Sequence, residues 1–400
     1  MALMPVEDAR QTVLAGAKPL GVETVALREA DRRVLSRDLK ARRDQPPFPA
    51  SAMDGYAVRA ADIPEAGSSL VIAGASAAGH GYRGALKAGQ AIRIFTGAPV
   101  PKGADTVVLQ EDTVAEGGHV RIAAVPRAGQ SVRRRGLDFA RGETVIGKNT
   151  RLSARLLGLA AAMNFASLPV WRRPRVALFT TGDELVAPGG RPGIDQIISS
   201  NSTALAVMIE RAGADVTDLG IVPDTLKATR RAIARAADHD ILITTGGASV
   251  GDHDFVRAAL QDEGVALDFW KVAMRPGKPL MFGRRPGQRV LGLPGNPVSA
   301  LVCAEIFLKP LIAALTGLNP AIATTPARAG GPLKANDQRQ DFIRARLQRE
   351  ADGSFRATPF PLQDSSMQRT LAEAGCLILR APFAPATETG AAIEVIVLED

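Results

Sequence analysis

Between residues 175 and about 316 the sequence alternates strand-like and helix-like patterns, and few folds accommodate that order. Short aliphatic and β-branched runs are separated by longer amphipathic segments. The predicted elements are strands at 175–180, 216–221 and 241–245, helices at 202–212, 225–237 and 254–262, further strands near 267–273, 279–282 and 289–292, and a long helix from Pro297. This order is typical of a doubly wound α/β sheet.

A glycine-containing loop follows the third strand, in the stretch Asp240–Phe255 with the sequence DILITTGGASVGDHDF. In parallel α/β sheets, ligands bind at the carboxyl ends of the strands, where loops and helix N-termini converge. Gly246 and Gly247 let backbone approach a ligand closely, and Ser249 follows in the same loop. These three residues are therefore candidate substrate contacts. The alternative is a βα turn with an ordinary aspartate cap.

Acidic residues follow the ends of the first three strands. They include Glu184 in TTGDE, Asp224 in IVPDT and Asp254 in GDHDF. If the strands are parallel, these carboxylates lie on one rim, where like charges about 4 Å apart repel by roughly 4 kcal/mol at an effective dielectric of about 20. A cation removes that repulsion, and an all-oxygen ligand set favours Mg²⁺ over zinc. The alternative for Asp224 is a simple cap of the helix that begins near Thr225.

Basic and hydroxyl side chains follow the later strands. Arg275 and Lys278 flank a Pro-Gly turn in MRPGKP, and both cations suit an oxyanion. The next turn, LPGNPVSA, contains Pro294 and Pro297, and Ser299 lies in the first turn of the helix that follows. The free N–H groups of a helix start form an anion site. The sequence thus predicts a phosphate or oxyanion site on the same rim.

The rest of the chain changes pattern several times, as expected for 400 residues, which are too many for one compact core. Helices are predicted at 5–17, 27–39 and within 143–166, and Asp352-Gly353 predicts a hairpin turn. Three prolines within residues 46–49 predict an extended linker. The predicted domains are a helical domain in two parts (1–44 and 139–173), an inserted β-rich domain (45–138), the α/β domain (174–325) and a C-terminal β domain (326–400).

Polar residues outside the α/β domain have simple structural interpretations on their own. Asp54 lies in an Asp-Gly turn, and Thr96 stands before a Gly-Ala-Pro turn that its hydroxyl can cap. Arg344 and Ser365 are polar residues of the C-terminal domain for which surface exposure is a sufficient explanation. Each becomes a functional candidate only through the resemblance described below.

Composition limits the class of partner. The net charge is +8, but arginines are spread along the chain and the run Arg133–Arg135 is short, which favours small anions over nucleic acid. Cys303 and Cys376 lie in apolar runs, which fits buried thiols in a reducing compartment. The N-terminus lacks the order of a signal peptide, and no uninterrupted apolar run of membrane-spanning length is expected. We therefore expect a cytoplasmic protein without membrane or nucleic-acid partners.

Eight motifs in one order resemble the molybdopterin molybdenumtransferases, the MoeA and gephyrin E-domain family. They are PASAMDGYAV, IFTGAPVP, RRRGLD, TTGDEL, TTGGASVGDHDF, RPGKP, LPGNPVSA and QDSS. The resemblance implies a four-domain homodimer whose α/β domain is similar to the molybdopterin adenylyltransferase fold. It also implies Mg²⁺-dependent insertion of molybdate into adenylylated molybdopterin, with release of AMP and molybdenum cofactor, and an upstream molybdopterin adenylyltransferase as a possible partner.

The resemblance also implies roles for single residues. Three match motif residues near the site that reach over from the partner subunit: Asp54, Thr96 and Asp138. Three match the acidic residues for Mg²⁺ and the adenylyl phosphate: Glu184, Asp224 and Asp254. Four match the oxyanion pocket for molybdate, with Pro294 and Pro297 shaping the loop beside it: Lys278, Ser299, Arg344 and Ser365. Arg275 stands where family members often have lysine.

Two other functions compete with this interpretation. The α/β domain by itself suits molybdopterin adenylylation, the preceding step, which consumes ATP. A non-catalytic dimeric scaffold that presents a peptide-binding groove is the second alternative. The RPGKP and LPGNPVSA motifs and the late Arg344 and Ser365 favour metal insertion over the first, and the complete set of acidic and basic residues argues against the second. No Ser-His-Asp or Cys-His arrangement is apparent, so we expect no covalent enzyme intermediate.

Overall fold

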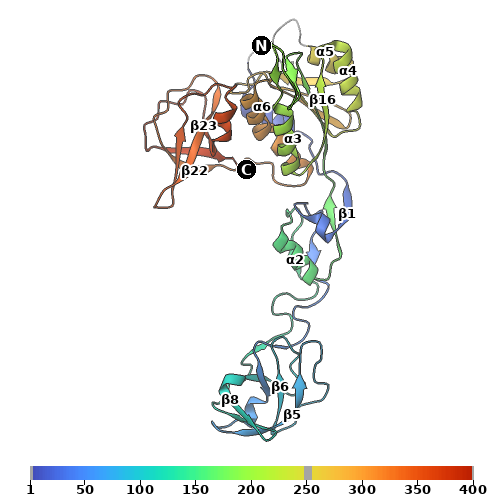
Figure 1. Cartoon of the computed structure of the whole chain (residues 1–400), viewed down its shortest axis with the longest axis vertical. Helices are drawn as coiled ribbons and strands as arrows, with labels where there is room; N and C mark the ends of the chain where they lie inside the picture. The colour runs from blue at the N-terminus through green and yellow to red at the C-terminus, as the bar shows by residue number, and fades with distance from the viewer. Residues whose placement is uncertain (1–2, 247–254, 399–400) are drawn as a thin grey trace. The chain divides into compact units, whose positions relative to one another are not determined.

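The structure is a computed structural model that describes residues 3–246 and 255–398. The chain forms two compact units, drawn in Figure 1. The large unit contains the chain up to Glu23, the short piece Arg32–Val34, and the chain from Trp171 onward. The small unit contains Thr24–Asp31 and Leu35–Val170.

A six-stranded sheet forms the centre of the large unit, in the order β16-β13-β17-β21-β20-β18. The first four strands are parallel: β16 (Asp215–Val222), β13 (Arg175–Thr181), β17 (Ile241–Thr245) and β21 (Gln288–Leu293). The last two are antiparallel: β20 (Met281–Arg285) and β18 (Ala266–Trp270). The predicted doubly wound α/β domain is confirmed. The predicted strand at 267–273 is shorter than expected and ends at Trp270.

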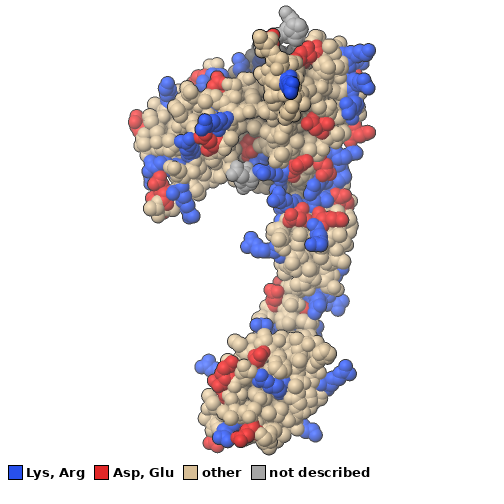
Figure 2. All heavy atoms as spheres, in the orientation of Figure 1, with Lys and Arg blue, Asp and Glu red and all other residues tan. Residues whose placement is uncertain are grey.

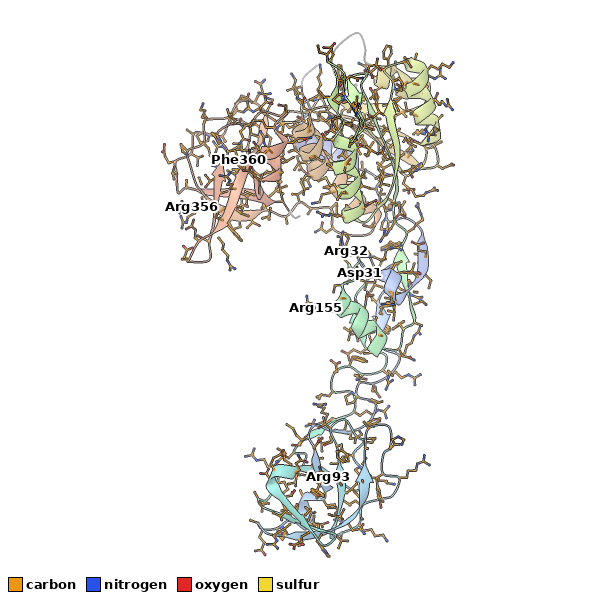
Figure 3. All side chains as sticks on the ribbon, viewed as in Figure 1. Asp31, Arg32, Arg93, Arg155, Arg356 and Phe360 are labelled. Carbon is orange, nitrogen blue, oxygen red and sulfur yellow. The ribbon has the colours of Figure 1, made fainter. Side chains whose placement is uncertain are left out.

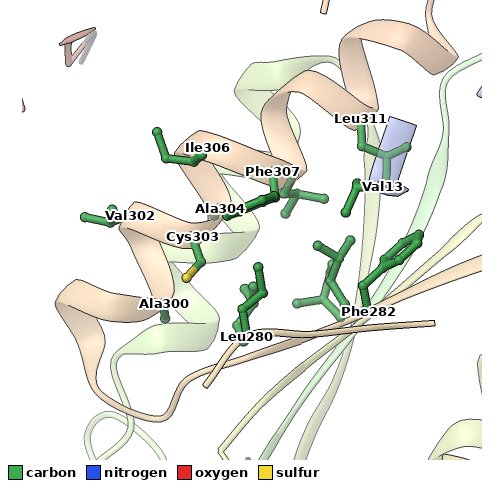
Figure 4. Packing of buried hydrophobic residues seen from close by; sticks show 14 of the residues in the cluster. Val13, Leu280, Phe282, Ala300, Val302, Cys303, Ala304, Ile306, Phe307 and Leu311 are labelled. Carbon is green, nitrogen blue, oxygen red and sulfur yellow. The ribbon is translucent and has the colours of Figure 1, made fainter. Parts of the chain in front are cut away.

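Helices cover both faces of this sheet. One face carries α1 (Val6–Leu14), α3 (Asn201–Ala212), α6 (Pro297–Cys303) and α7 (Lys309–Leu315), and the other carries α4 (Leu226–Arg235) and α5 (Phe255–Asp262). Figure 4 shows the first face, where buried side chains of α6 and α7 pack on Leu280 and Phe282. Because Val13 of α1 lies in this cluster, the N-terminal residues pack with the α/β domain and not with the helical domain predicted for 1–44.

The helical run Pro297–Leu315 is long and apolar enough to cross a membrane, although the sequence analysis expected no such run. It consists of α6, a π-helical turn (Ala304–Leu308) and α7. The large unit buries 78% of its most apolar window. Burial in the core therefore explains its composition, and it is the one such helix among the described residues.

The C-terminal part of the large unit is a closed β sheet with the order β19-β23-β24-β22-β26-β25, in which β25 also pairs with β23. Its strands are β22 (Thr325–Ala329), β23 (Gln340–Arg349), β24 (Phe355–Pro359), β25 (Cys376–Arg380) and β26 (Ala392–Val397), with α8 (Gln368–Ala372) between β24 and β25. The predicted hairpin turn at Asp352-Gly353 is confirmed by the β23–β24 pairing. The α/β domain adds β19 (Met274–Arg275) to this sheet through a parallel pairing with β23.

The small unit is built around a second six-stranded sheet, in the order β7-β4-β6-β5-β9-β8. Its strands are β4 (Gly55–Val58), β5 (Ser69–Ser76), β6 (Gln90–Ile94), β7 (Thr106–Leu109), β8 (Thr113–Glu116) and β9 (His119–Ile122). The rest of the unit contains α2 (Ala154–Ala162) and the short strands β2 (Leu39–Lys40), β3 (Ala50–Ser51), β10 (Val132–Arg133) and β11 (Thr144–Ile146). Two further strands, β1 (Val22–Ala26) and β12 (Ser167–Trp171), belong partly to each unit. The predicted β-rich domain is thus confirmed, with the α-helix α2 after it and, among the described residues of this unit, only a 3₁₀ turn before it.

The predicted helix at 27–39 is wrong. Only a 3₁₀ turn forms, Leu27–Ala30, and Arg32 adopts a left-handed φ of 58° that interrupts any helix. Beyond it, the N–H of Leu35 donates to the carbonyl of Thr150 at 3.1 Å, so the backbone bonds leave the segment. Leu35 and Leu39 then pack in the core of the small unit. Tertiary pairing therefore overrides the local helical pattern.

Candidate functional site

The loops that follow the parallel strands of the large unit meet at one rim. Gly246, directly after β17, has a φ of 88°, and a Cβ there would lie 2.2 Å from the carbonyl oxygen of Thr181 at the end of β13. A Cβ on Gly295, after β21, would lie 3.5 Å from the Cα of Gly246. Three loops therefore touch backbone to backbone, as the parallel arrangement predicted. Gly247 and Ser249 lie outside the described residues.

Asp224 lies at this rim beside the end of β13. The hydroxyl of Thr181 donates a hydrogen bond to its carboxylate, and its own N–H donates to the carboxylate of Asp183 at 3.1 Å. The cap of α4 is Thr225, whose hydroxyl accepts from the N–H of Ala228 at 3.2 Å. The alternative interpretation of Asp224 as a helix cap is therefore wrong, and its carboxylate faces the neighbouring loop.

Glu184 follows Asp183 in the same exposed loop. Its carboxylate folds over Gly182, where a Cβ would lie 2.6 Å from Oε2 of Glu184. Asp254, the third predicted metal ligand, lies outside the described residues. Within residues 3–246 and 255–398, no three His, Cys, Asp or Glu side chains are grouped closely enough to hold a metal ion. Asp183, the other acid of TTGDE in this loop, accepts the N–H of Asp224.

Asn201 was missed by the sequence analysis and joins two of the rim loops. Its Nδ2 donates to the hydroxyl of Thr245 at 3.1 Å and to the carbonyl of Gly295 at 2.7 Å. Thr245 in turn donates to the carbonyl of Pro294 at 3.1 Å. Asn201 is 6% exposed, and its buried Oδ1 has no partner among the described residues. The available signal was its spacing: Asn201 directly precedes the helix predicted at 202–212 and lies four residues before the buried Leu205.

The loop that carries Lys278 is seated on α6. The N–H of Val272 donates to the carbonyl of Lys278 at 2.9 Å, which closes the loop. A Cβ on Gly277 would lie 2.5 Å from Sγ of Cys303, so the turn packs directly on that helix. The exposed ammonium of Lys278 has no ion-pair partner in the part of the chain that the structure describes. It therefore keeps a positive charge without an ion-pair partner among the described residues, on a turn that packs against Cys303 at the end of α6.

The start of α6 is joined to the C-terminal domain through Ser365. The amide of Asn296 donates to Oγ of Ser365 at 2.8 Å, and the N–H of Val298 donates to its carbonyl at 3.1 Å. Pro297 begins the helix and Ser299, 4% exposed, lies in its first turn. The hydroxyl residues predicted in two different domains, Ser299 and Ser365, are therefore brought to one helix end.

Arg344 projects from β23 toward the segment that holds Ser365. Its Nε donates to Gln363 at 3.2 Å and its Nη1 donates to the carbonyl of Asp364 at 2.9 Å. Arg344 is 0% exposed, and its Nη2 has no partner among the described residues. Burial lowers the pKa of this guanidinium, but the nearby Asp364 opposes that shift. A buried cation with an unused donor is suited to bind an anion.

Arg275 is paired with acids of the C-terminal domain. Its guanidinium contacts the carboxylates of Asp341 and, at 3.3 Å, Asp337, and donates to Oδ1 of Asn336 at 3.0 Å. Acidic and basic side chains are interspersed over the visible face of the molecule as a whole (Figure 2). Among the described residues, Lys278 has no carboxylate partner, whereas Arg275 has two.

Three predicted site residues lie in the small unit. Asp54 and Thr96 are hydrogen-bonded to each other, and Asp138 is separate. Oδ1 of Asp54 accepts hydrogen bonds from the N–H and the hydroxyl of Thr96, both at 2.7 Å. These bonds hold the pKa of Asp54 below its usual value. Arg93, marked in Figure 3, lies over the rings of Tyr56 and Phe95 next to this pair. Asp138 is exposed, and no hydrogen bond joins it to Asp54 within the described residues.

Comparison with known proteins identifies the family. The molybdopterin molybdenumtransferase of Haemophilus influenzae is 34% identical over 388 residues, which cover 94% of each chain. Residues 4–164 match the MoeA N-terminal region (domain I and II), residues 177–314 a probable molybdopterin binding domain, and residues 326–398 the MoeA C-terminal region (domain IV). The chain belongs to the MoeA family of molybdopterin molybdenumtransferases. The resemblance found from the eight motifs is thus confirmed.

Other MoeA relatives agree over the full length. The molybdopterin molybdenumtransferase of Bacillus subtilis is 34% identical over 412 residues, covering 99% of this chain and 94% of its own. The crystal structure of the MoeA protein from Pyrococcus horikoshii has a TM-score of 0.86 at 28% identity and covers 100% of both chains. The MoeA fold therefore includes both units of this chain.

Proposed function

We propose that this MoeA protein inserts molybdate into adenylylated molybdopterin in a Mg²⁺-dependent reaction that releases AMP and molybdenum cofactor. The observation that carries the proposal is Arg344, a fully buried cation beside the segment of Ser365 at the start of α6, whose Nη2 has no partner among the described residues. Molybdate is a tetrahedral dianion. A guanidinium, an ammonium, hydroxyls and helix-start N–H groups suit its charge and its oxygens.

The proposed molybdate site combines four side chains from two domains. Lys278 supplies a charge without an ion-pair partner among the described residues, Ser299 and Ser365 supply hydroxyls, and Arg344 supplies a donor that is unpaired among the same residues. Pro294 and Pro297 shape the turn between β21 and α6. The bonds from Asn296 and Val298 to Ser365, which hold the start of α6 against the segment of Ser365, support this combination. The residues act by binding and orientation, without a nucleophile of their own.

The proposed magnesium site lies on the carboxylate side of the rim. Glu184 and Asp224 offer oxygen ligands, and Asp254 is the third proposed ligand. The exposed carboxylate of Glu184 and the rim position of Asp224 would suit a hard cation such as Mg²⁺, which prefers oxygen ligands. Bound Mg²⁺ would supply positive charge to the phosphate oxygens as the bond to the adenylyl group breaks. The glycine loop, with Gly246, Gly247 and Ser249, would contact the substrate beside it.

We further propose that the protein acts as a cytoplasmic homodimer. In this arrangement Asp54, Thr96 and Asp138 of one copy complete the rim of the other. Mixing two inactive variants, Asp54→Ala and Lys278→Ala, tests this directly. In a homodimer with shared sites, mixed dimers contain one intact site and recover partial activity. Recovery of no activity from co-refolded or co-expressed variants would argue that each chain supplies its own complete site.

The decisive experiment is anaerobic incubation of the protein with adenylylated molybdopterin, Mg²⁺ and molybdate. AMP release that requires molybdate, followed by reconstitution of a molybdoenzyme, supports insertion. ATP consumption without molybdate would instead support molybdopterin adenylylation. Substrate binding without hydrolysis would support a non-catalytic scaffold. An isolated adenylyl-enzyme would contradict the proposed mechanism, because it requires a nucleophile from the protein.

A further inference from the structure

Arg275 connects the two domains that supply the proposed molybdate site. It lies in β19, which the α/β domain contributes to the C-terminal sheet, and its parallel pairing places it opposite Asp341 of β23. The two side chains form an ion pair, and the guanidinium also contacts Asp337 and Asn336. The N–H of Gln340 donates to the carbonyl of Ala273 at 2.9 Å, which fixes the register beside the pair. Backbone and side-chain contacts thus join the same two strands.

The charges around Arg275 leave it little attraction for an anion. Arg275 and Arg339 together carry two positive charges, and Asp337 and Asp341 carry two negative charges. Two carboxylates already face the guanidinium, so an approaching dianion meets a cluster without net charge. Lys278, three residues later, has no such partner among the described residues. Electrostatics therefore favour Lys278 over Arg275 as the molybdate contact.

Asp341 needs Arg275 for a physical reason of its own. It is 8% exposed, and its second oxygen is buried without a partner among the described residues. A carboxylate removed from water in this way requires a nearby cation. Arg275 is the cation in direct contact with it. The ion pair therefore stabilises the contact between the α/β domain and the C-terminal domain.

We propose that Arg275 is a positioning residue that sets the spacing between Lys278 and Arg344. Lys278 follows Arg275 by three residues in a turn that is seated on α6, and Arg344 follows Asp341 by three residues on β23. Fixing Arg275 against Asp341 therefore fixes the two cations relative to each other. This inference rests on the proposed molybdate site, and it assigns Arg275 a role at that site other than direct contact with the oxyanion.

The sign of the Asp341→Asn effect separates positioning from direct binding. If Arg275 positions the site, Arg275→Ala and Asp341→Asn should each raise the KM for molybdate by about tenfold. The double variant should have the same KM as either single variant, because all three variants break the same ion pair. If Arg275 binds molybdate directly, Asp341→Asn frees the guanidinium and lowers the KM or leaves it unchanged. An unchanged or lowered KM in Asp341→Asn overturns the inference.

The assay measures AMP release against molybdate concentration, and calorimetric titration with molybdate alone gives a second readout. Arg275→Lys, which keeps the charge and one contact, should recover part of the affinity. Asp268→Asn breaks a matched ion pair with Arg284, between the edge strand β18 and its neighbour β20, and should leave the KM unchanged. Thermal unfolding of every variant separates lost folding from altered affinity.

Lys278→Ala distinguishes failure of the inference from failure of the proposed function. If Lys278→Ala raises the KM for molybdate but Asp341→Asn does not, the molybdate site stands and the positioning role of Arg275 is wrong. If the unmodified protein shows no molybdate dependence in either assay, the proposed function fails and the inference fails with it.

Discussion

Thr96 donates two hydrogen bonds to a single oxygen of Asp54, from its N–H and from its hydroxyl, both at 2.7 Å. The two residues are 42 positions apart and lie in turns at the ends of neighbouring strands, β4 and β6. Sequence alone gave each residue a separate turn role. The structure shows that Thr96 orients the carboxylate of Asp54 and stabilises its charged form.

Thr96→Ala should raise the pKa of Asp54 toward its ordinary value of 3.8 without fully restoring it, because the backbone donor remains. An NMR titration of the Asp54 carboxyl measures the shift. Thr113→Ala, which removes a hydroxyl that donates to the carbonyl of Gln110 in the same unit, should leave that pKa unchanged. An equal shift in both variants would exclude a specific effect of Thr96.

The same bonds predict an acid dependence of stability. The folded-state pKa of Asp54 lies below the unfolded value, so its contribution is present above about pH 3.8 and is lost as the pH falls through the folded pKa. Unfolding followed from pH 5 to pH 2, in about half-unit steps, should show a smaller acid-dependent loss in Thr96→Ala than in the unmodified protein. Identical slopes in the two proteins would contradict this prediction.

Gly246→Ala should destabilise the protein because two penalties coincide. The left-handed φ of 88° costs about 1 to 2 kcal/mol with a Cβ present, and that Cβ would meet the carbonyl oxygen of Thr181 at 2.2 Å. Gly287→Ala is the matched control, because Gly287 has a φ of 78° and nothing within 4 Å of the added Cβ. Denaturant unfolding should show a larger loss of unfolding free energy for Gly246→Ala. Equal losses would mean that the loop moves away from β13 without penalty.

The meeting of the loops at the carboxyl ends of the parallel strands could be predicted from the sequence. Parallel strands place their carboxyl ends at one edge, so the convergence of the loops with Asp224 and Gly246 follows once the alternating pattern is recognised. The hairpin at Asp352-Gly353 follows from two residues whose preferences are local. These features depend on short stretches of sequence or on a rule of the fold.

Contacts between distant segments were not predictable in the same way. The bond from Asn296 to Ser365 and the ion pair of Arg275 with Asp341 join residues more than 60 positions apart, and no single stretch encodes them. The absent helix at 27–39 has the same cause, because Leu35 bonds to Thr150 instead of to its own segment. Pairing across the fold decided these features.

Asn201→Ala should destabilise the large unit by about 1 to 3 kcal/mol, because the carbonyl of Gly295 loses a buried donor. The rim loops then lose their connection, so the KM for adenylylated molybdopterin should rise as well. Thr203→Ala, at an exposed position of the same helix, is the control and should change neither quantity. Loss of stability without any change in KM would show that Asn201 supports the core but not the substrate site.

Arg344→Lys should raise the KM for molybdate by about tenfold, because lysine keeps the charge but cannot reproduce the planar fork that reaches Gln363 and Asp364 while leaving Nη2 unused. Calorimetric titration with molybdate measures the change in affinity. Arg346→Ala is the control, since that exposed arginine pairs with Glu373 and lies over Phe360, which Figure 3 marks. Equal loss in both variants would indicate a general effect of positive charge.

Glu184→Gln and Asp224→Asn should each raise the Mg²⁺ concentration needed for half-maximal AMP release, because each removes a charged oxygen ligand from the proposed metal site. Excess Mg²⁺ should restore much of the rate if the lost interaction is metal binding. The control is Asp218→Asn, whose carboxylate accepts the N–H of Gly220 within β16. A reduced rate that no Mg²⁺ concentration restores would place Glu184 or Asp224 in contact with the substrate instead of the metal.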